Sequence, residues 1–227
     1  MADLPDNVHV SSHPCLRAKL SQLRSKSTNA KEVRSLVHDI SLLVACEALA
    51  SAVHVAPGPK DVTTLGFEYT TTQASPQSIC LVPILRSGLG MVDALQTLLP
   101  DPVPVHHLGL YREPSTLEPV EYYNNLPSHV GEPTGQNAGK LAIVLDPVIA
   151  TGGTCAAAIQ SLREWGVDRI LVLSVIAALP GVKKAAAEWP EGVQVWVAGV
   201  DSELTGQGML KPGLGDIGDR LFLTIGK

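Results

Sequence analysis

The sequence has few aromatic residues, few cysteines and no long hydrophobic run. Aromatics make up 4% of its 227 residues, so its core must be aliphatic. The four cysteines lie at Cys15, Cys46, Cys80 and Cys155 and form no C-x-x-C pair, which argues against zinc and thioredoxin-type sites. We therefore expect four reduced thiols in a cytoplasmic protein.

Signals for export, membranes and nucleic acids are also missing. The start, MADLPDNVHVSSHPC, has no basic segment followed by an apolar run, so no secretory signal is predicted. No stretch approaches the ~18 apolar residues that a membrane span needs. The net charge is −5 and Lys and Arg do not cluster, which argues against nucleic-acid binding. We expect a cytoplasmic protein with neither a membrane nor a nucleic-acid partner.

What the sequence does contain is enough apolar material for a large core. Hydrophobic residues make up 45% and charged residues 17%, a balance that argues against disorder. A chain of this length predicts one domain, or a domain with an appendage, and needs no disulfide or metal to stabilise it.

Short apolar runs alternate with helical patterns along much of the chain. Unbroken apolar runs predict buried strands, and apolar residues spaced by three and four predict helices. The predicted strands are 79–85, 103–111, 141–146, 170–177 and 193–200, and the predicted helices are 28–54, 89–98, 154–165 and 181–190. This alternation indicates an α/β fold with a parallel sheet covered on both faces.

The helix boundaries also carry signals. Thr28 or Asn29 is expected to cap the first helix, Pro57-Gly58-Pro59 to stop it, and Gly166 to end the helix over 154–165. The polar stretch 112–140 has no steady period and is too long for an ordinary connection, so we expect a functional loop there.

The segment after LAIVLD carries the clearest chemical signal. It reads Asp146-Pro147-Val148-Ile149-Ala150-Thr151-Gly152-Gly153-Thr154 and follows a predicted strand. Ligands of open parallel sheets bind beyond the carboxyl ends of the strands. Two glycines permit close backbone approach, and the start of the next helix favours phosphate. Neither G-x-x-x-x-G-K-[ST] nor G-x-G-x-x-G is present, so the two common nucleotide loops are excluded. An acid before such a loop suits sugar hydroxyls or a metal ion.

Four segments resemble one family in the same order. LAIVLDPVIATGGTCAAAI resembles the loop of type I phosphoribosyltransferases that binds 5-phosphoribosyl diphosphate (PRPP), and its Asp146-Pro147 resembles the uracil phosphoribosyltransferase branch. The segments VPILRSGLGMVDAL (82–95), GLYREPSTLEPVEYYNNLP (109–127) and KPGLGDIGDRLF (211–222) resemble that branch too, as does His13-Pro14 with Lys19 and Leu20. The resemblance implies transfer of the phosphoribosyl group from PRPP to uracil, giving UMP and diphosphate.

The same resemblance implies an architecture. It is a type I phosphoribosyltransferase-like parallel sheet flanked by helices, in a single domain over 1–227. A small hood would be formed by an N-terminal helical segment, 1–56, and a C-terminal base-binding segment, 201–227.

The resemblance also implies site residues. The PRPP ligands are Arg86, Arg112, Asp146, Pro147, Val148, Ile149, Ala150, Thr151, Gly152, Gly153, Thr154 and Asp216. The uracil ligands are Leu210, Gly215, Asp216 and Ile217. Arg112 and Asp216 are the catalytic residues, and Asp216 either stabilises a ribosyl cation or orients the base nitrogen. Asp219 and Arg220 are expected to form a structural ion pair. Met209, Ile217 and Ser87 depart from residues common in the family and leave the size of the pocket open.

Cofactor and partners follow from the resemblance as well. Mg²⁺ would be bound mainly through PRPP, with no dedicated protein metal site. The family forms homodimers or homotetramers, and GTP is an effector candidate. Two other functions were weighed. The missing second acid and the P-G-L-G-D segment argue against a purine phosphoribosyltransferase. A non-enzymatic regulator that binds nucleotide or RNA is the other alternative. The acidic charge without a Lys/Arg cluster argues against RNA, and intact Arg86, Arg112 and Asp146 argue that PRPP still binds.

Overall fold

The structure is a computed structural model, and it describes residues 4–113, 119–127 and 140–224. Its helices are α1 (Pro14–Arg24), α2 (Ala30–Ala52), α3 (Leu89–Leu98), α4 (Gly153–Trp165), α5 (Leu179–Ala187) and α6 (Ile217–Phe222). Its main strands are β1 (Val8–Val10), β4 (Ile79–Leu85), β5 (Leu108–Arg112), β6 (Pro119–Asn124), β7 (Leu141–Leu145), β9 (Arg169–Ser174) and β11 (Val193–Val197). The short or peripheral strands are β2 (His54–Val62), β3 (Glu68–Ser75), β8 (Val148–Ile149), β10 (Ile176–Ala178), β12 (Val200–Asp201), β13 (Glu203–Leu204) and β14 (Leu210–Lys211).

Seven strands form the central sheet in the order β1-β11-β9-β7-β4-β5-β6. Every neighbouring pair is parallel except β5 and β6, which run antiparallel at one edge. The prediction of a parallel α/β sheet is therefore confirmed. In the register of β4 and β7, Pro83 lies opposite Leu145, so both strands end at the same edge of the sheet.

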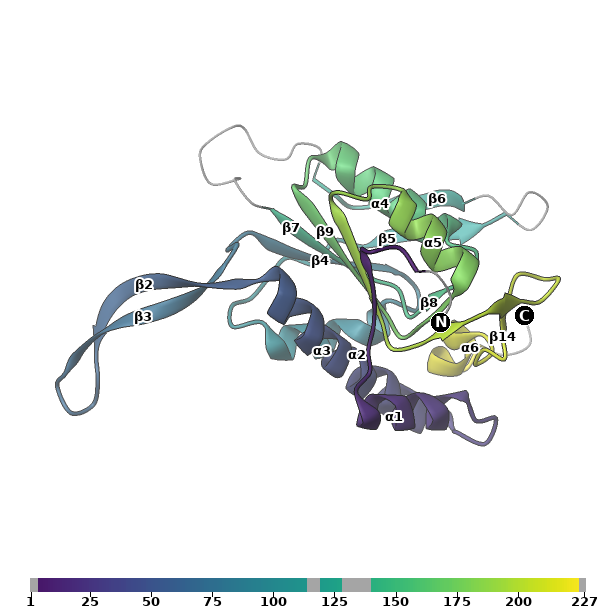
Figure 1. Ribbon diagram of the computed structural model, residues 1–227, viewed down its shortest axis with the longest axis horizontal. Helices are drawn as coiled ribbons and strands as arrows, with labels where there is room; N and C mark the ends of the chain where they lie inside the picture. Colours follow the sequence, from purple (N-terminus) through teal and green to yellow (C-terminus); the bar gives the residue numbers. More distant parts are fainter. Residues whose placement is uncertain (1–3, 114–118, 128–139, 225–227) are drawn as a thin grey trace.

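Both faces of the sheet are buried, which explains the unbroken apolar runs. Along β7, Leu141, Ile143 and Leu145 face the core cluster that contains α2 and α3, and Ala142 and Val144 face the cluster that contains α4 and α5. Figure 1 shows these two helix pairs on opposite sides of the strands. The aliphatic core expected from the composition is thus split into two layers.

The predicted helix starts and stops are confirmed in part. Asn29 accepts hydrogen bonds from the amides of Lys31 and Glu32, and the Glu32 carboxylate accepts from the Asn29 amide, so a capping box starts α2. Gly166 ends α4 with φ +88°. The helix α2, however, ends at Ala52, and Pro57-Gly58-Pro59 lies inside β2 rather than at the helix end.

Helix α2 is also long and apolar enough to cross a membrane by length and composition, with 44% of its most apolar window buried. The sequence did not predict a helix of this kind, because polar residues interrupt its apolar ones and no unbroken apolar run is present. A core helix of a soluble protein meets the same criterion, and α2 packs in the core cluster that covers the sheet.

Several elements differ from the sequence predictions, and helix α1 is one that was not predicted. The predicted strand 103–111 begins only at Leu108, and Val105 contributes an isolated bridge to Leu81. The polar stretch 112–140 contains an edge strand, β6. The hairpin β2–β3 was not predicted, and Figure 1 shows it extending away from the rest of the chain.

Candidate active site

Two adjoining cavities lie at the carboxyl edge of the sheet. The first, of about 220 Å³, is lined by Ile84, Leu85, Ser87, Leu110, Asp146, Val148, Ile149, Ala150, Thr151, Gly152, Thr154 and Cys155. The second, of about 290 Å³, is lined by Leu85, Arg86, Ser87, Val148, Met209, Gly215, Asp216, Ile217 and Gly218. They share Leu85, Ser87 and Val148, so the segment after β4 and the segment after β7 form a common wall.

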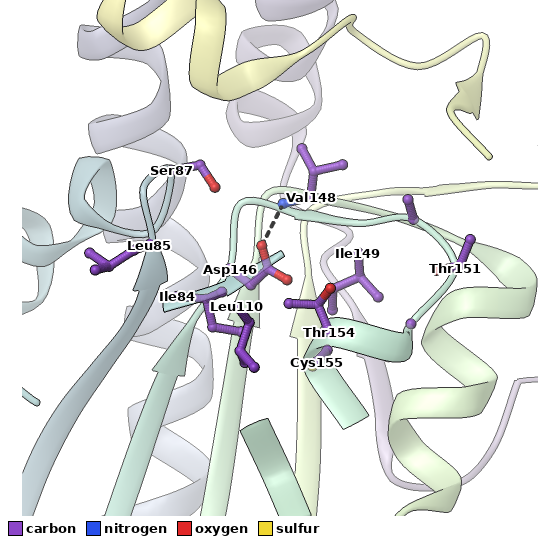
Figure 2. Close-up of a pocket in the computed structure, with 12 residues that line it drawn as sticks. Ile84, Leu85, Ser87, Leu110, Asp146, Val148, Ile149, Thr151, Thr154 and Cys155 are labelled. Atoms are coloured by element: carbon purple, nitrogen blue, oxygen red, sulfur yellow. Dashed lines mark hydrogen bonds between the residues drawn. The ribbon is translucent and has the colours of Figure 1, made fainter. Parts of the chain in front are cut away.

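Asp146 lies at the base of the first cavity, directly after β7. Asp146 is only 7% exposed, and the backbone amide of Val148 donates a hydrogen bond to its carboxylate at 3.4 Å (Figure 2). Within the described part of the chain no other group donates to this carboxylate. Burial raises the pKa of Asp146 to about 7, and the Val148 amide opposes that shift. A buried acid with one weak donor suits a ligand that brings hydroxyl donors to the cavity.

Close backbone packing shapes the loop that follows Asp146. Gly152 has φ +78°, and a Cβ there would overlap the carbonyl oxygen of Gly181. A Cβ on Gly181 would overlap the carbonyl oxygen of Ala150. Only glycine fits at these two positions, because the start of α5 touches the loop through backbone atoms. The loop is therefore held in place from behind.

The start of α4 completes the first cavity. No side chain caps this helix, so its first-turn amides stay available to an anion. Thr151 and Thr154 both line the cavity (Figure 2). Backbone amides, hydroxyls and a helix N-terminus together favour a phosphate group.

Arg86 follows β4 and lines the second cavity rather than the first. Its guanidinium lies 3.8 Å from the Asp219 carboxylate and its side chain is 53% exposed, so it is accessible to an anionic ligand. Gly88, two residues later, allows this turn to pack on the end of β7, because a Cβ there would overlap the Leu145 carbonyl oxygen. The backbone of Arg112 ends β5, and its side chain lies outside the described atoms.

The C-terminal segment forms the other wall of the second cavity. Gly215 has φ +78°, and Asp216 begins α6 by accepting a hydrogen bond from the Asp219 amide at 3.0 Å. Ile217 is buried and Met209 lines the cavity. Leu210 does not line either cavity, because it pairs with Leu204 in the β13–β14 ladder.

The prediction of an Asp219–Arg220 ion pair is wrong. Asp219 lies near Arg86 and accepts a hydrogen bond from the Thr224 hydroxyl. Arg220 donates to three carbonyl oxygens, those of Leu23, Leu214 and Ser25, at 2.6, 2.8 and 3.0 Å. Backbone carbonyls therefore fix the Arg220 side chain, which links the C-terminal segment to the N-terminal segment.

The structure places most of the predicted site residues around the two cavities. Among the predicted PRPP ligands, the first cavity is lined by Asp146, Val148, Ile149, Ala150, Thr151, Gly152 and Thr154. Pro147 and Gly153 are not among its lining residues, and Arg86 and Asp216 line the second cavity. Of the predicted uracil ligands, the second cavity is lined by Gly215, Asp216 and Ile217.

Four lining residues were missed as site residues: Ile84, Leu85, Leu110 and Cys155. The first three lie at or near strand ends, so the rule that ligands bind at the carboxyl edge could have found them. Burial, and secondarily the Asp146 carboxylate, raise the pKa of the Cys155 thiol well above its ordinary value. The thiol is thus neutral and unsuited to act as a nucleophile.

A magnesium ion bound mainly through its ligand fits these residues. In the described ranges, no three His, Cys, Asp or Glu side chains gather as a metal cluster. The two cavities instead hold one carboxylate each, from Asp146 and Asp216. Mg²⁺ keeps several waters and accepts phosphate oxygens, so one or two carboxylates are sufficient.

A phosphate-binding loop, a buried acid and an adjoining small cavity at one edge of a parallel sheet are the parts expected of a phosphoribosyltransferase. A family model described as uracil phosphoribosyltransferase matches residues 10–224. The uracil phosphoribosyltransferases of Bacillus thuringiensis (strain Al Hakam) and Bacillus mycoides (strain KBAB4) are each 41% identical over 217 residues, 96% of this chain and 98% of theirs. The solved structure of the AQ2163 protein from Aquifex aeolicus is 30% identical with a TM-score of 0.84, covering 96% of this chain and 98% of that one. The chain belongs to the uracil phosphoribosyltransferase family, as its motifs predicted.

Proposed function

We propose that the protein transfers the 5-phosphoribosyl group of PRPP to uracil, releasing diphosphate and forming UMP. Family membership over almost the whole chain supports the reaction. The observation that carries the assignment to this site is the pair of adjoining cavities, which share Leu85, Ser87 and Val148. A phosphosugar in the first cavity and a small base in the second would meet at that shared wall.

PRPP makes three demands, and the first cavity with its rim meets each. The backbone amides of the 150–154 loop and the start of α4 donate to the 5′-phosphate. The Asp146 carboxylate accepts hydrogen bonds from the ribose hydroxyls, which supply the donors that its burial leaves missing. Arg86, with Arg112, binds the diphosphate, because guanidinium groups bind phosphate oxygens bidentately.

Uracil occupies the second cavity in this proposal. It is small, neutral and planar, and Gly215 and Ile217 present backbone groups to its carbonyls and N3–H at close range. Leu210 stays in the proposal only through its backbone, since its side chain packs in the core. Asp216 lies exposed beside this cavity, where its carboxylate stabilises a ribosyl cation or orients the base nitrogen.

The reaction needs position and charge more than a nucleophile. The bond from the anomeric carbon to the diphosphate oxygen breaks, a bond from that carbon to the base nitrogen forms, and that nitrogen releases its proton to the departing diphosphate or to water. Developing negative charge on the diphosphate is stabilised by the guanidinium groups, usually the largest catalytic contribution. Mg²⁺, when bound through the diphosphate oxygens, adds to that stabilisation. The neutral Cys155 thiol takes no part.

We propose a single domain with a small hood formed by 1–56 and 201–227. Side-chain contacts between these two segments support it. Arg24 binds the Asp201 carboxylate through both Nη atoms, at 2.6 and 3.0 Å, and also donates to the Gly213 carbonyl. Arg220, in the C-terminal segment, in turn donates to the carbonyl oxygens of Leu23 and Ser25 in the N-terminal segment. The loop that forms the base cavity is thereby anchored to α1.

We also propose a homodimer or homotetramer that uses the β2–β3 hairpin. Leu65 is 82% exposed and Phe67 68% exposed, and Val55, Val62 and Tyr69 add exposed apolar surface along the same hairpin. A two-stranded hairpin is marginally stable in water by itself, and exposed apolar patches mark interaction sites. A second copy of the chain would cover this surface.

The remaining assignments are a cytoplasmic location, no nucleic-acid or membrane partner, and GTP as an effector. They follow from the net charge of −5 and from the family resemblance. Addition of GTP to the assay below tests the effector directly.

The test of function is a product assay with competing bases. The purified protein is incubated with PRPP, Mg²⁺ and equal amounts of uracil, hypoxanthine and adenine, and nucleotides are separated and quantified. The proposal expects UMP alone. Formation of IMP or AMP in place of UMP would assign the base cavity to purines, and no nucleotide at all would refute transferase activity.

A further inference from the structure

Lys184 on α5 lies beside the first residue of α4. A methyl group built on Gly153 would lie 3.8 Å from the Nζ of Lys184 and 3.9 Å from the Oγ1 of Thr151. An ammonium, a hydroxyl and the free amides of a helix N-terminus therefore converge on one small region. The packing of Gly181 on the loop fixes the start of α5 there, as described above.

Among the residues that the structure describes, the charge of Lys184 has no acidic partner. The side chain is exposed, and within the described residues it forms no ion pair. The other neighbours of the methyl group built on Gly153 are the Pro119 ring, at 3.7 Å, and the Thr151 hydroxyl. Neither of these, nor the positive end of α4, offsets a positive charge. An ammonium beside a helix N-terminus is favourable when an anion lies between them.

We propose that Lys184 is a further ligand of the 5′-phosphate of PRPP, contacting it from the α5 side of the 150–154 loop. This inference rests on the proposed function, since it takes the loop as the 5′-phosphate site. The sequence motifs did not indicate this residue, because Lys184 lies on the next helix and outside the loop. Lysine suits the position, since a phosphate is bound well by a mobile point charge.

The experiment compares Lys184→Gln with Lys183→Gln, which removes the same charge from the adjacent position of the same helix. Binding of ribose 5-phosphate, which carries the 5′-phosphate without the diphosphate, is measured by calorimetry at low ionic strength. Inhibition by inorganic diphosphate is measured in parallel. We expect Lys184→Gln to weaken ribose 5-phosphate binding about tenfold, the effect of one charge-assisted hydrogen bond. Diphosphate inhibition should not change, and Lys183→Gln should match the wild type.

Kinetics add a second readout. The KM for PRPP should rise about tenfold in Lys184→Gln with the KM for uracil unchanged, and Lys184→Arg should recover most of the loss. Wild-type binding of ribose 5-phosphate by Lys184→Gln would overturn the proposal and leave a solvated surface lysine. An equal loss in both variants would overturn it in favour of diffuse surface charge, and a selective loss of diphosphate inhibition would show the wrong phosphate.

The proposed reaction and the assignment of Lys184 can be refuted independently of each other. If the wild type binds ribose 5-phosphate in a Lys184-dependent way but forms no UMP, the proposed reaction is contradicted and the Lys184 assignment holds. If UMP forms and Lys184→Gln is unaffected in both assays, the reaction holds and the assignment to Lys184 is overturned.

Discussion

Asp146 is a buried carboxyl group whose environment disfavours its charge. Folding raises its pKa from 3.8 to about 7, and the cause is burial at the end of β7. Burying this carboxyl group lowers the stability of the folded protein, so we infer that its role is to bind a ligand. The ribose hydroxyls of PRPP need an acceptor, and the ionised form is the better one.

PRPP use should therefore depend on pH through Asp146. In the free enzyme the carboxyl is protonated below about pH 7 and ionised above it. We expect kcat/KM for PRPP to fall about tenfold per pH unit below that pKa and to level off above it. Asp146→Asn should lower kcat/KM and flatten the profile, and the titration of PRPP itself is common to both proteins. A wild-type profile no steeper than that of the variant would contradict this role.

The same residue should affect stability with a defined sign. Between pH 4 and 7 the folded protein keeps a proton that the unfolded chain releases, so the free energy of unfolding falls as pH rises. Asp146→Asn removes this contribution. Denaturant titrations should find the variant more stable than the wild type at pH 8, with a smaller gap at pH 4.

Gly181 offers a test of the close packing behind the phosphate loop. Gly181→Ala places a Cβ on the Ala150 carbonyl oxygen, and neither backbone can yield cheaply. We expect a loss of about 1 to 3 kcal/mol in stability, a raised KM for PRPP and little change in the KM for uracil. Gly206→Ala is the control, because nothing lies within 4 Å of a Cβ there. Equal behaviour of the two variants would refute the packing argument.

At the scale of elements, the buried strands were predictable and the exposed ones were not. The strands β4 and β7 lie between two helix layers, so every position is apolar and the signal is strong. The strands β2, β3 and β6 are largely exposed, and their sequences show no regular alternation of apolar and polar residues. Helix α1 was missed although Leu16, Leu20 and Leu23 are buried, because eleven residues supply few periodic positions.

The site likewise has one part that was predictable from the sequence and one part that was not. The loop from Asp146 to Thr154 is contiguous, so a motif describes it. The adjoining cavity combines Arg86 with Met209 and Gly215, which lie far from it in the C-terminal part of the chain. Only the register of β4 with β7 and the C-terminal ties bring them together. Family motifs indicated that Arg86 and Asp216 belong to the site, but not which cavity each lines.

Substitutions in the β2–β3 hairpin test whether this hairpin forms the proposed interface between copies of the chain. Leu65→Glu combined with Phe67→Glu places two charges on large, exposed apolar residues near its tip. We expect light scattering to give a homodimer or homotetramer for the wild type and a smaller species for the variant. Thr64→Glu, a charge added at the same exposed tip, should keep the wild-type mass. A monomeric wild type would contradict the proposed oligomer.

At the scale of the molecule, the two ends of the chain are joined beside the base cavity. Asp201 is 4% exposed at its side chain, and it binds the Arg24 guanidinium and the Gly213 amide. Gly213 lies in the loop that leads to Gly215. Through this buried ion pair, α1 therefore positions the loop from Gly213 to Gly215, which lines the second cavity.

Breaking that pair should affect both stability and uracil. Arg24→Ala leaves a buried carboxylate without its partner, at a cost of about 3 kcal/mol. Tm should fall by about 6 to 12 °C, and the KM for uracil should rise more than the KM for PRPP. Lys211→Ala breaks an exposed pair with Glu203 on the neighbouring ladder and should leave Tm unchanged. Similar effects of the two substitutions would argue against the positioning role.

The most direct measurement is UMP formation from labelled uracil and PRPP with Mg²⁺, run on the wild type, Arg112→Ala and Asp216→Ala. The account predicts activity in the wild type and a loss of about 100-fold or more in each variant, the usual effect of removing one preorganised charged group. No UMP from a wild type that still binds PRPP, or near-normal activity in either variant, would contradict it.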